Sequence, residues 1–165
     1  MAEVSWRKAT SGDLPQIVAI YNQAVRHGIA TDDDQPQTVS SRQKWFHSYD
    51  DHHPLWVVEK AGQVAGWVGL EVFFPHPNFA QTVEISIYFD DQFQHQHLGS
   101  ATLAFIDQQA RHLGVKTIVA HIYERNLPSQ QLFQKNGYHH AGELTNIAVI
   151  RGENRSVETY LKHFE

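Results

Sequence analysis

Residues 94–105, QHQHLGSATLAF, combine groups that could hold a phosphate or pyrophosphate. They follow a β-prone run that ends at Phe89, and helical spacing of apolar residues starts at Leu98. The N-terminus of a helix presents unpaired N–H groups and the positive end of the helix dipole, which favour an anion. Gly99 would let the backbone approach a ligand closely, and Ser100 adds a hydroxyl. Taken alone, the stretch is more simply interpreted as a capped helix that binds nothing.

The histidines of this stretch, His95 and His97, could instead be metal ligands. A zinc site needs three or four converging ligands, and neither HExxH nor a comparable spacing occurs in the chain. Other histidines stand in adjacent pairs such as His52-His53, whose side chains tend to point apart, and the chain has no cysteine. We therefore expect no metal and interpret the 12 histidines as scattered surface residues.

Periodicity and turn residues predict elements in the order β-α-α-β-β-β-α-β-α-β-β to position these groups. The expected strands are 4–8, two runs around a turn at 61–63, then 82–89, 116–123, 138–150 and 156–164, the last two joined by the turn RGEN. The expected helices are one from Ser11 or Asp13 to near Gly28, then 39–48, 98–113 and 127–137. Helices between hairpins and a strand-helix-strand unit predict a mixed sheet with helices on its faces, in a single domain over residues 1–165.

Composition narrows the classes of partner. The net charge of −5, without a basic patch, argues against nucleic acid. The sequence shows neither a secretory signal nor a long apolar run, so we expect a soluble cytoplasmic protein without a membrane partner.

Residues 126–138 and the stretch proposed to hold a phosphate together form a pattern that resembles a known family. The order strand, Gln94-x-x-x-x-Gly99, helix, strand, Asn126-x-x-Ser129-x-x-Leu132-Phe133-x-x-x-Gly137-Tyr138 resembles the GNAT acetyltransferases. Within that superfamily, Tyr21-Asn22 and the run from Thr82 to Tyr88 look like the phosphinothricin and methionine-sulfoximine N-acetyltransferases. The resemblance covers roughly residues 5–144 and implies the GNAT fold, an α/β (α+β) architecture with a mixed, mostly antiparallel twisted sheet of about seven strands and about four flanking helices.

The resemblance also implies the roles of individual residues. Acetyl-CoA would be the cosubstrate, with its pantetheine arm along the backbone of one strand, its pyrophosphate on the loop and helix start, and its thiol end near a second helix. The residues implied for it are Ile87, Tyr88, Phe89, His95, Gln96, His97, Leu98, Gly99, Ser100, Asn126 and Ser129. The residues expected to contact the acceptor are Tyr21, His76 and Phe79.

Glu84 matches the glutamate that this branch is thought to use as its base. An amine attacks a thioester only when it is neutral, and a carboxylate can remove its proton directly or through a water. Glu84 interrupts an apolar run and shares one strand face with Ser86 and Tyr88, so a solvated sheet face is the alternative without the resemblance.

The chain departs from the family pattern at several positions. His97 stands in place of the first glycine of the loop and needs φ < 0 or a tolerated left-handed conformation. Phe133 stands where relatives carry a tyrosine or histidine that can protonate the leaving thiolate. The loop FFPHPNFAQ lacks the arginine that relatives use for a substrate carboxylate; Arg151 and Arg155 could contact anions, but solvated turn residues are the simpler interpretation.

These observations predict an N-acetyltransferase that moves the acetyl group of acetyl-CoA to a primary amine of a small molecule, an amino acid or analogue. We expect a homodimer, as in relatives. The alternatives are acetylation of a protein or peptide amine, or an acyl-CoA-binding protein with little catalysis.

Overall fold

The computed structural model describes residues 3–165. Within them the strands are β1 (Val4–Lys8), β2 (Leu55–Lys60), β3 (Gln63–Val72), β4 (Thr82–Phe89), β5 (Thr117–Tyr123), β6 (His139–Ile150) and β7 (Glu153–His163). The helices are α1 (Leu14–His27), α2 (Val39–Phe46), α3 (Leu98–Leu113) and α4 (Leu127–Lys135), and short 3-10 turns occupy Ser11–Asp13, Pro77–Phe79 and Asp91–Phe93. The predicted element order and the mixed α/β fold class are confirmed.

All strands in the described chain join one sheet in the order β1-β2-β3-β4-β5-β7-β6. Every neighbouring pair is antiparallel except β4 and β5, which run parallel. That parallel pairing joins only Thr82, Val83 and Glu84 to Thr117, Ile118 and Val119. Beyond Glu84, β4 pairs only with β3, so the two central strands separate along the rest of their length.

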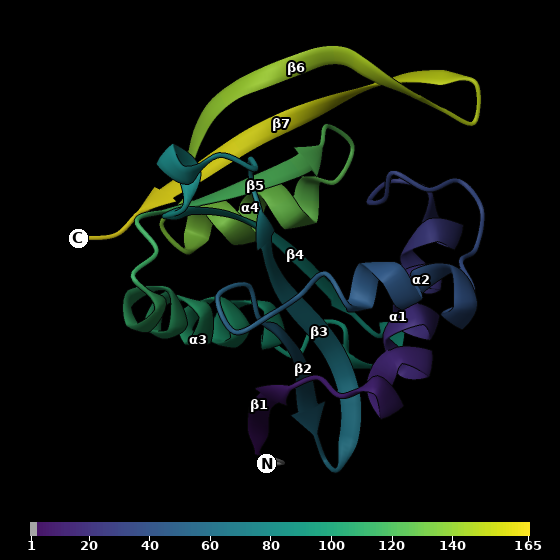
Figure 1. Cartoon of the computed structure of the whole chain (residues 1–165). Coiled ribbons are helices and arrows are strands. Elements are labelled where there is room, and N and C mark those ends of the chain that lie inside the picture. Colours follow the sequence, from purple (N-terminus) through teal and green to yellow (C-terminus); the bar gives the residue numbers. More distant parts are fainter. Residues whose placement is uncertain (1–2) are drawn as a thin grey trace.

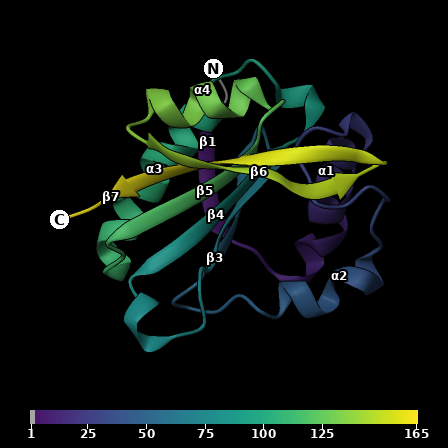
Figure 2. The ribbon, with the colours of Figure 1, turned by 90° about the horizontal axis from the view of Figure 1, so that it is seen from above.

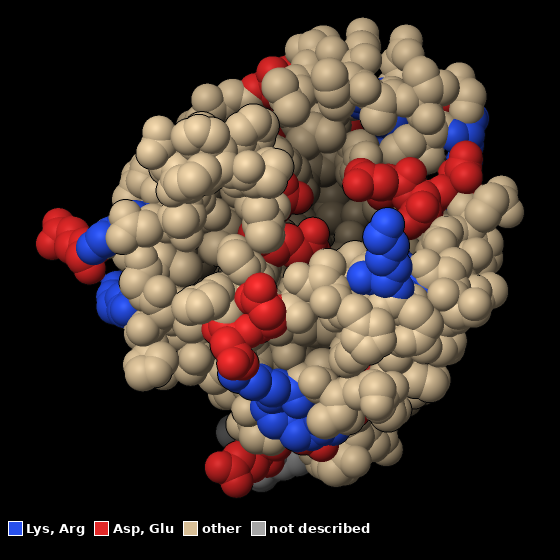
Figure 3. All heavy atoms as spheres, in the orientation of Figure 1, with Lys and Arg blue, Asp and Glu red and all other residues tan. Residues whose placement is uncertain are grey.

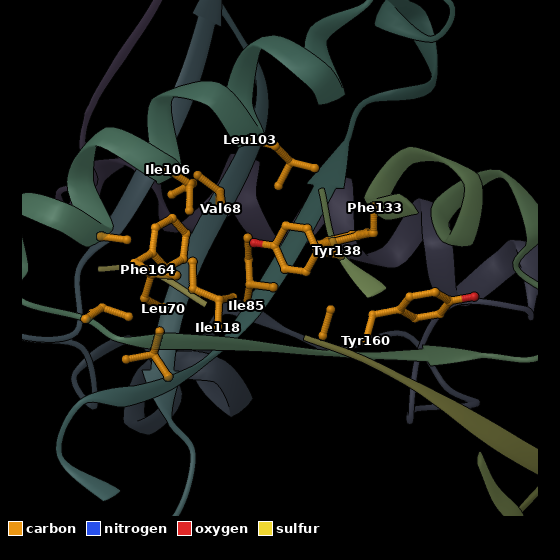
Figure 4. Close-up of a cluster of buried hydrophobic side chains, with 14 of the residues drawn as sticks. Val68, Leu70, Ile85, Leu103, Ile106, Ile118, Phe133, Tyr138, Tyr160 and Phe164 are labelled. Carbon is orange, nitrogen blue, oxygen red and sulfur yellow. The ribbon is translucent and has the colours of Figure 1, made fainter. Parts of the chain in front are cut away.

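Helices cover both faces of the sheet (Figures 1 and 2), with α3 and α4 on one side and α1 and α2 on the other. Side chains along β2 alternate between the two faces: Trp56 joins the core beneath α3 and α4, whereas Leu55 and Val57 join the core beneath α1. Figure 4 shows the larger core, in which Leu103 and Ile106 of α3 and Phe133 of α4 pack against strand residues. Burial of both faces fixes the register of the strands, because a slip by one residue would exchange the two sets.

The last hairpin differs from the prediction at its turn. We expected a four-residue turn, RGEN, but the turn contains only Arg151 and Gly152, and Ile150 pairs directly with Glu153. Both turn residues have positive φ, 52° and 76°, the combination of a two-residue type I′ turn, which matches the twist of the flanking strands. The last strand therefore starts at Glu153 instead of Ser156. The second helix ends at Phe46, slightly before the predicted Ser48.

The start of α1 shows how the first loop is fixed. Pro15 occupies the first turn and Gly28 ends the helix with φ 77°, both as predicted. The Asp13 carboxylate turns back to the Thr10 N–H at 2.7 Å and to the Arg7 guanidinium at 2.7 Å. This ties the end of β1 to the helix start.

Candidate active site

A cavity of about 1360 Å³ opens where β4 and β5 separate. Its wall comes from these two strands, from the starts of α3 and α4, from α1 and α2, and from β6 and β7. Figure 3 shows the molecule hollowed at its centre, with acidic side chains around the hollow and a basic side chain at its edge. The Glu84 strand, the loop of residues 94–100 and the start of α4 thus face one space, as the resemblance implies.

The second half of β4 presents an open backbone edge to this cavity. Ile87, Tyr88 and Phe89 line the cavity and pair with β3 on one side only. N–H and C=O groups along such an edge can pair with an extended ligand as another strand would. The geometry fits the predicted position of a pantetheine arm.

In the loop before α3, His97 has the left-handed conformation expected of the glycine that relatives carry at this position. His97 has φ 60° and ψ 21°, and His95 has φ 62°, so both histidines are left-handed. No side chain caps the start of α3, which leaves its first N–H groups free for an anion. All six residues from His95 to Ser100 line the cavity. The substitution of histidine for glycine therefore leaves the helix start open.

Gly99 lies where α3 approaches α4 closely. A Cβ at this position would lie 2.8 Å from Cδ2 of Leu132, which is closer than real Cβ contacts. The small residue thus lets α3 approach α4, and both helix starts border the same cavity. We predicted close approach to a ligand here, and the nearest neighbour in the structure is Leu132.

Asn126 and Ser129 form the cap of α4, and both line the cavity. The Asn126 side chain accepts a hydrogen bond from the Ser129 N–H at 3.3 Å. One turn later Phe133 is buried against Tyr138, with ring centroids 4.8 Å apart. Burial raises the pKa of Tyr138 well above its ordinary range, so its hydroxyl is a poor proton donor near neutral pH.

Glu84 faces the cavity at the last residue of the parallel pairing, next to His121 of β5. The His121 Nδ1 and the Glu84 Oε1 are 3.1 Å apart, and each side chain is about one-third exposed, 31% and 32% respectively. The hydrogen bond that His121 donates to the Glu84 carboxylate raises the pKa of His121, burial opposes this rise, and the charges of Glu84 and Asp32 add to it. The candidate base therefore has a hydrogen-bonded partner that can carry a positive charge.

This pair predicts a pH-dependent contribution to stability. Because the folded-state pKa of His121 is raised, the contribution is fully present below the ordinary histidine pKa of ~6.5 and is lost as pH rises through the folded-state value. Relative to wild type, His121→Gln should lose more stability at pH ~5.5 than at pH ~9, by less than about 1 kcal/mol because the pair is partly exposed. Urea unfolding at the two pH values measures the difference, and an identical loss at both would contradict the assignment.

Glu71 is a second carboxylate beside Glu84, and sequence reasoning missed it. The two residues are direct partners across β3 and β4, so their side chains share one face of the sheet. The Glu71 carboxylate accepts hydrogen bonds from the Tyr49 hydroxyl at 2.8 Å and the Ser86 hydroxyl at 2.9 Å. Tyr49 can reach it because Gly69 has no side chain: a Cβ there would lie 2.6 Å from the Tyr49 hydroxyl.

The loop between α1 and α2 supplies the remaining polar wall. Tyr21, expected to contact the acceptor, lines the cavity, and its hydroxyl donates to Asp33 at 2.5 Å. Asp32 accepts from the hydroxyl of Tyr123, which also lines the cavity. Asn22 fixes this loop through two hydrogen bonds with the Gln37 backbone, at 2.8 and 2.9 Å. The sequence indicates only that Asp32 and Asp33 belong to a loop. In the structure this loop folds so that both residues line the cavity.

Other predicted residues lie elsewhere. His76 and Phe79, expected near the acceptor, are exposed on the loop before β4 and do not belong to the cavity wall. Phe79 packs instead on Phe73 and Phe74, with ring centroids 6.1 and 5.1 Å away. Arg155 is not a solvated turn residue: it is 2% exposed, and it donates to Glu124 and to the Gly28 carbonyl.

Residues 3–165 contain no group of three or more His, Cys, Asp or Glu side chains placed to hold a metal ion. Of the helices described, none is both long and apolar enough to cross a membrane.

Comparison with known proteins identifies the family. The family model described as an acetyltransferase (GNAT) domain matches residues 4–139. The Bacillus subtilis protein YwnH, provisionally named a phosphinothricin acetyltransferase, is 35% identical over 148 residues, which cover 89% of this chain and 91% of YwnH. An L-methionine sulfoximine/L-methionine sulfone acetyltransferase from Pseudomonas paraeruginosa is 32% identical over 145 residues, which cover 87% of this chain and 84% of that protein.

The solved structure of one similar protein contains acetyl-CoA. YncA of Salmonella typhimurium, provisionally described as an acetyltransferase, has been solved with its cofactor acetyl-CoA. It matches this chain with a TM-score of 0.89 at 26% identity, over 98% of this chain and 94% of YncA. The open edge of β4 and the uncapped start of α3 are the features of this chain that fit such a cosubstrate. The chain therefore belongs to the GNAT acetyltransferase family and is an acyltransferase that uses acetyl-CoA.

Proposed function

We propose that the protein transfers the acetyl group of acetyl-CoA to the primary amine of a small molecule, an amino acid or a close analogue. The position of Glu84 carries the proposal, because this carboxylate faces the cavity where the open edge of β4 begins. The names of the two curated relatives, which refer to phosphinothricin and to methionine sulfoximine and sulfone, support the acceptor class.

In this proposal different residues bind the cosubstrate and deprotonate the acceptor. The backbone of Ile87, Tyr88 and Phe89 and the N–H groups at the start of α3 hold the cosubstrate, which supplies the acetyl group as a thioester. Glu84 accepts a proton from the acceptor ammonium, directly or through a water. The neutral amine can then attack the thioester carbonyl: the C–N bond forms, the C–S bond breaks, the thiolate leaves, and the nitrogen releases its second proton to solvent to give the amide.

Phe133 gives the leaving thiolate no proton donor, and burial makes the neighbouring Tyr138 hydroxyl a poor one. A thiol of pKa ~8.5 is a good leaving group without a dedicated acid. We therefore propose that thiolate release needs no protein acid, with solvent as the final proton source.

A thiol-release assay with acetyl-CoA and a panel of amines tests the proposal. We expect turnover with L-methionine sulfoximine or another amino acid. Turnover restricted to peptide N-termini or lysine side chains would favour a peptide acetyltransferase. Binding of CoA without turnover of any amine would favour an acyl-CoA-binding protein.

We further propose that the protein is a homodimer formed through β6. This strand is one of the two outer strands of the sheet, and its side chains Leu144, Ile147 and Val149 are large, apolar and exposed, Val149 to 70%. Leu144 and Ile147 also border the cavity, so Val149 is the side chain of the three that lies outside its wall. An exposed apolar edge strand is a template for pairing with a second chain. Two copies of the same exposed apolar strand can pair with each other, so we expect the partner to be a second copy of this chain.

Val149→Asp should therefore convert the dimer to a monomer without changing the fold, because a charge cannot be buried unpaired in an interface. Light scattering coupled to size-exclusion chromatography measures the mass of both forms. Val72→Asp is the matched control, since Val72 is an exposed valine on β3, 52% exposed, and should leave the mass unchanged. A monomeric wild type would overturn the proposal.

We propose that the whole chain works as one catalytic domain in the cytoplasm, independent of nucleic acid and membranes. The net charge of −5 and the use of acetyl-CoA support this. Fractionation of cells against cytoplasmic and membrane marker proteins checks the location.

A further inference from the structure

Arg42 is an unusual side chain of the cavity wall. It stands on α2, and its guanidinium lies over the ring of Tyr21, 4.2 Å from the centroid, and over the ring of Trp45, 4.8 Å from the centroid. The side chain is 18% exposed and lines the cavity. The two rings fix its position, so the guanidinium is already held in place before a ligand arrives.

The donors of Arg42 are free. Its side chain donates no hydrogen bond to residues 3–165, and the nearest carboxylate oxygen, on Asp33, is 3.8 Å away, beyond hydrogen-bond distance. The side chain keeps part of its surface exposed and borders the cavity, so its donors can be reached by a ligand there. Arg155 differs in this respect, since it hydrogen-bonds to Glu124 and the Gly28 carbonyl.

The charged side chains give the cavity wall a positive part at Arg42 on α2 and a negative part at Glu71 and Glu84 on the sheet. Asp33 accepts a hydrogen bond from the Tyr21 hydroxyl, and Arg42 is a positive neighbour 3.8 Å away that does not donate to it. Glu71 and Glu84 lie together on the sheet face, where their negative charges favour an ammonium group. Burial raises the pKa of Tyr49, Glu71 adds to the rise, and the positive charge of Arg42 opposes it. The guanidinium therefore lies within electrostatic range of the tyrosine that hydrogen-bonds to Glu71.

We propose that Arg42 binds the carboxylate of the acceptor, so that the acceptor is a zwitterion with its amine toward Glu84. A planar guanidinium with free donors matches a carboxylate in a bidentate geometry. The loop before β4 has no arginine for this purpose, and its residues His76 and Phe79 lie outside the cavity wall. The inference rests on the proposed function and names the group that selects amino acids among amines.

Kinetics with a matched pair of acceptors test this proposal: L-methionine sulfoximine and its carboxyl methyl ester. Arg42→Gln should raise the KM for the acid by about 10- to 100-fold, the range of a lost charge-assisted hydrogen bond, with a smaller change in kcat. The KM for the ester should change little, and Arg42→Lys should restore part of the affinity for the acid. Lys44→Gln, on the same helix but outside the cavity wall, is the control and should match wild type.

The outcomes separate the two proposals. If wild type acetylates the ester but not the acid, the amino-acid acceptor class fails, and the role of Arg42 fails with it. If wild type acetylates the acid and Arg42→Gln raises the KM values for acid and ester equally, the acceptor class stands. In that case Arg42 only supports Tyr21 and Trp45, and the carboxylate assignment is overturned.

Discussion

Glu84→Gln is expected to lower kcat/KM by about 10²- to 10⁴-fold, the usual contribution of a positioned general base. Glutamine keeps the size and one hydrogen-bond acceptor of the side chain but cannot take a proton from an ammonium. The dissociation constant for acetyl-CoA should stay close to that of wild type, because the residues proposed to hold it lie on the second half of β4 and on the starts of α3 and α4. Steady-state kinetics and calorimetric titration with CoA measure the two quantities.

The defect should also shrink as pH rises, because a growing fraction of the free amine is then neutral and needs no base. Glu143→Gln is the matched control, since Glu143 is exposed on β6 and does not line the cavity. Wild-type turnover by Glu84→Gln near pH ~7 would remove Glu84 from the role of base.

Arg155→Ala is expected to lower the free energy of unfolding by about 3 kcal/mol, at the lower end of the range for breaking a buried ion pair. The Arg155 Nε donates to Glu124 at 3.0 Å, another nitrogen donates to the Gly28 carbonyl at 3.1 Å, and the guanidinium lies 5.1 Å from the centroid of the Tyr123 ring. Removal leaves the Glu124 carboxylate with only the Ser156 N–H, 3.1 Å away, and takes the side-chain donor from the Gly28 carbonyl. The Glu124 side chain keeps 29% exposure, and its remaining hydration limits the loss.

Arg151→Ala provides the comparison for this prediction. Arg151 stands in the turn of the same hairpin and also donates to the end of α1, at the Val25 carbonyl, 2.8 Å away. It is exposed, so its loss should cost no more than about 1 kcal/mol. Chemical denaturation of both variants measures the difference, and equal losses would show that burial of Arg155 contributes nothing.

The fold could be predicted largely from local patterns. Helical spacing from Leu98 stops at Gly114, which has φ 75° and caps α3, and the alternating run Thr82–Phe89 forms β4 as expected. The error at the last hairpin has a local cause as well. Polar residues after Gly152 suggested a long turn, but a two-residue turn lets them continue as strand, and Arg155 becomes buried there.

The candidate site could be predicted only where its residues share a motif. Glu84 and the stretch His95–Ser100 stand within continuous patterns, and the structure brings them to one cavity. Arg42 and Glu71 belong to no such pattern. They face the same cavity because α2 packs over β3, and these two elements are separated in the sequence. His121 shows the same limit: its contact with Glu84 follows from the short parallel pairing of β4 and β5.

That short pairing has a consequence for self-association. A strand edge with free N–H and C=O groups is a hazard at a protein surface, because other chains can extend the sheet there and aggregate. The free edge of β4 lies in the middle of the sheet, recessed between β3 and β5, where a narrow flexible ligand can enter but the sheet of another molecule cannot. The protein thus keeps a hydrogen-bonding edge open to ligands while shielding it from misassembly, and the outer edges of the sheet are those of β1 and β6.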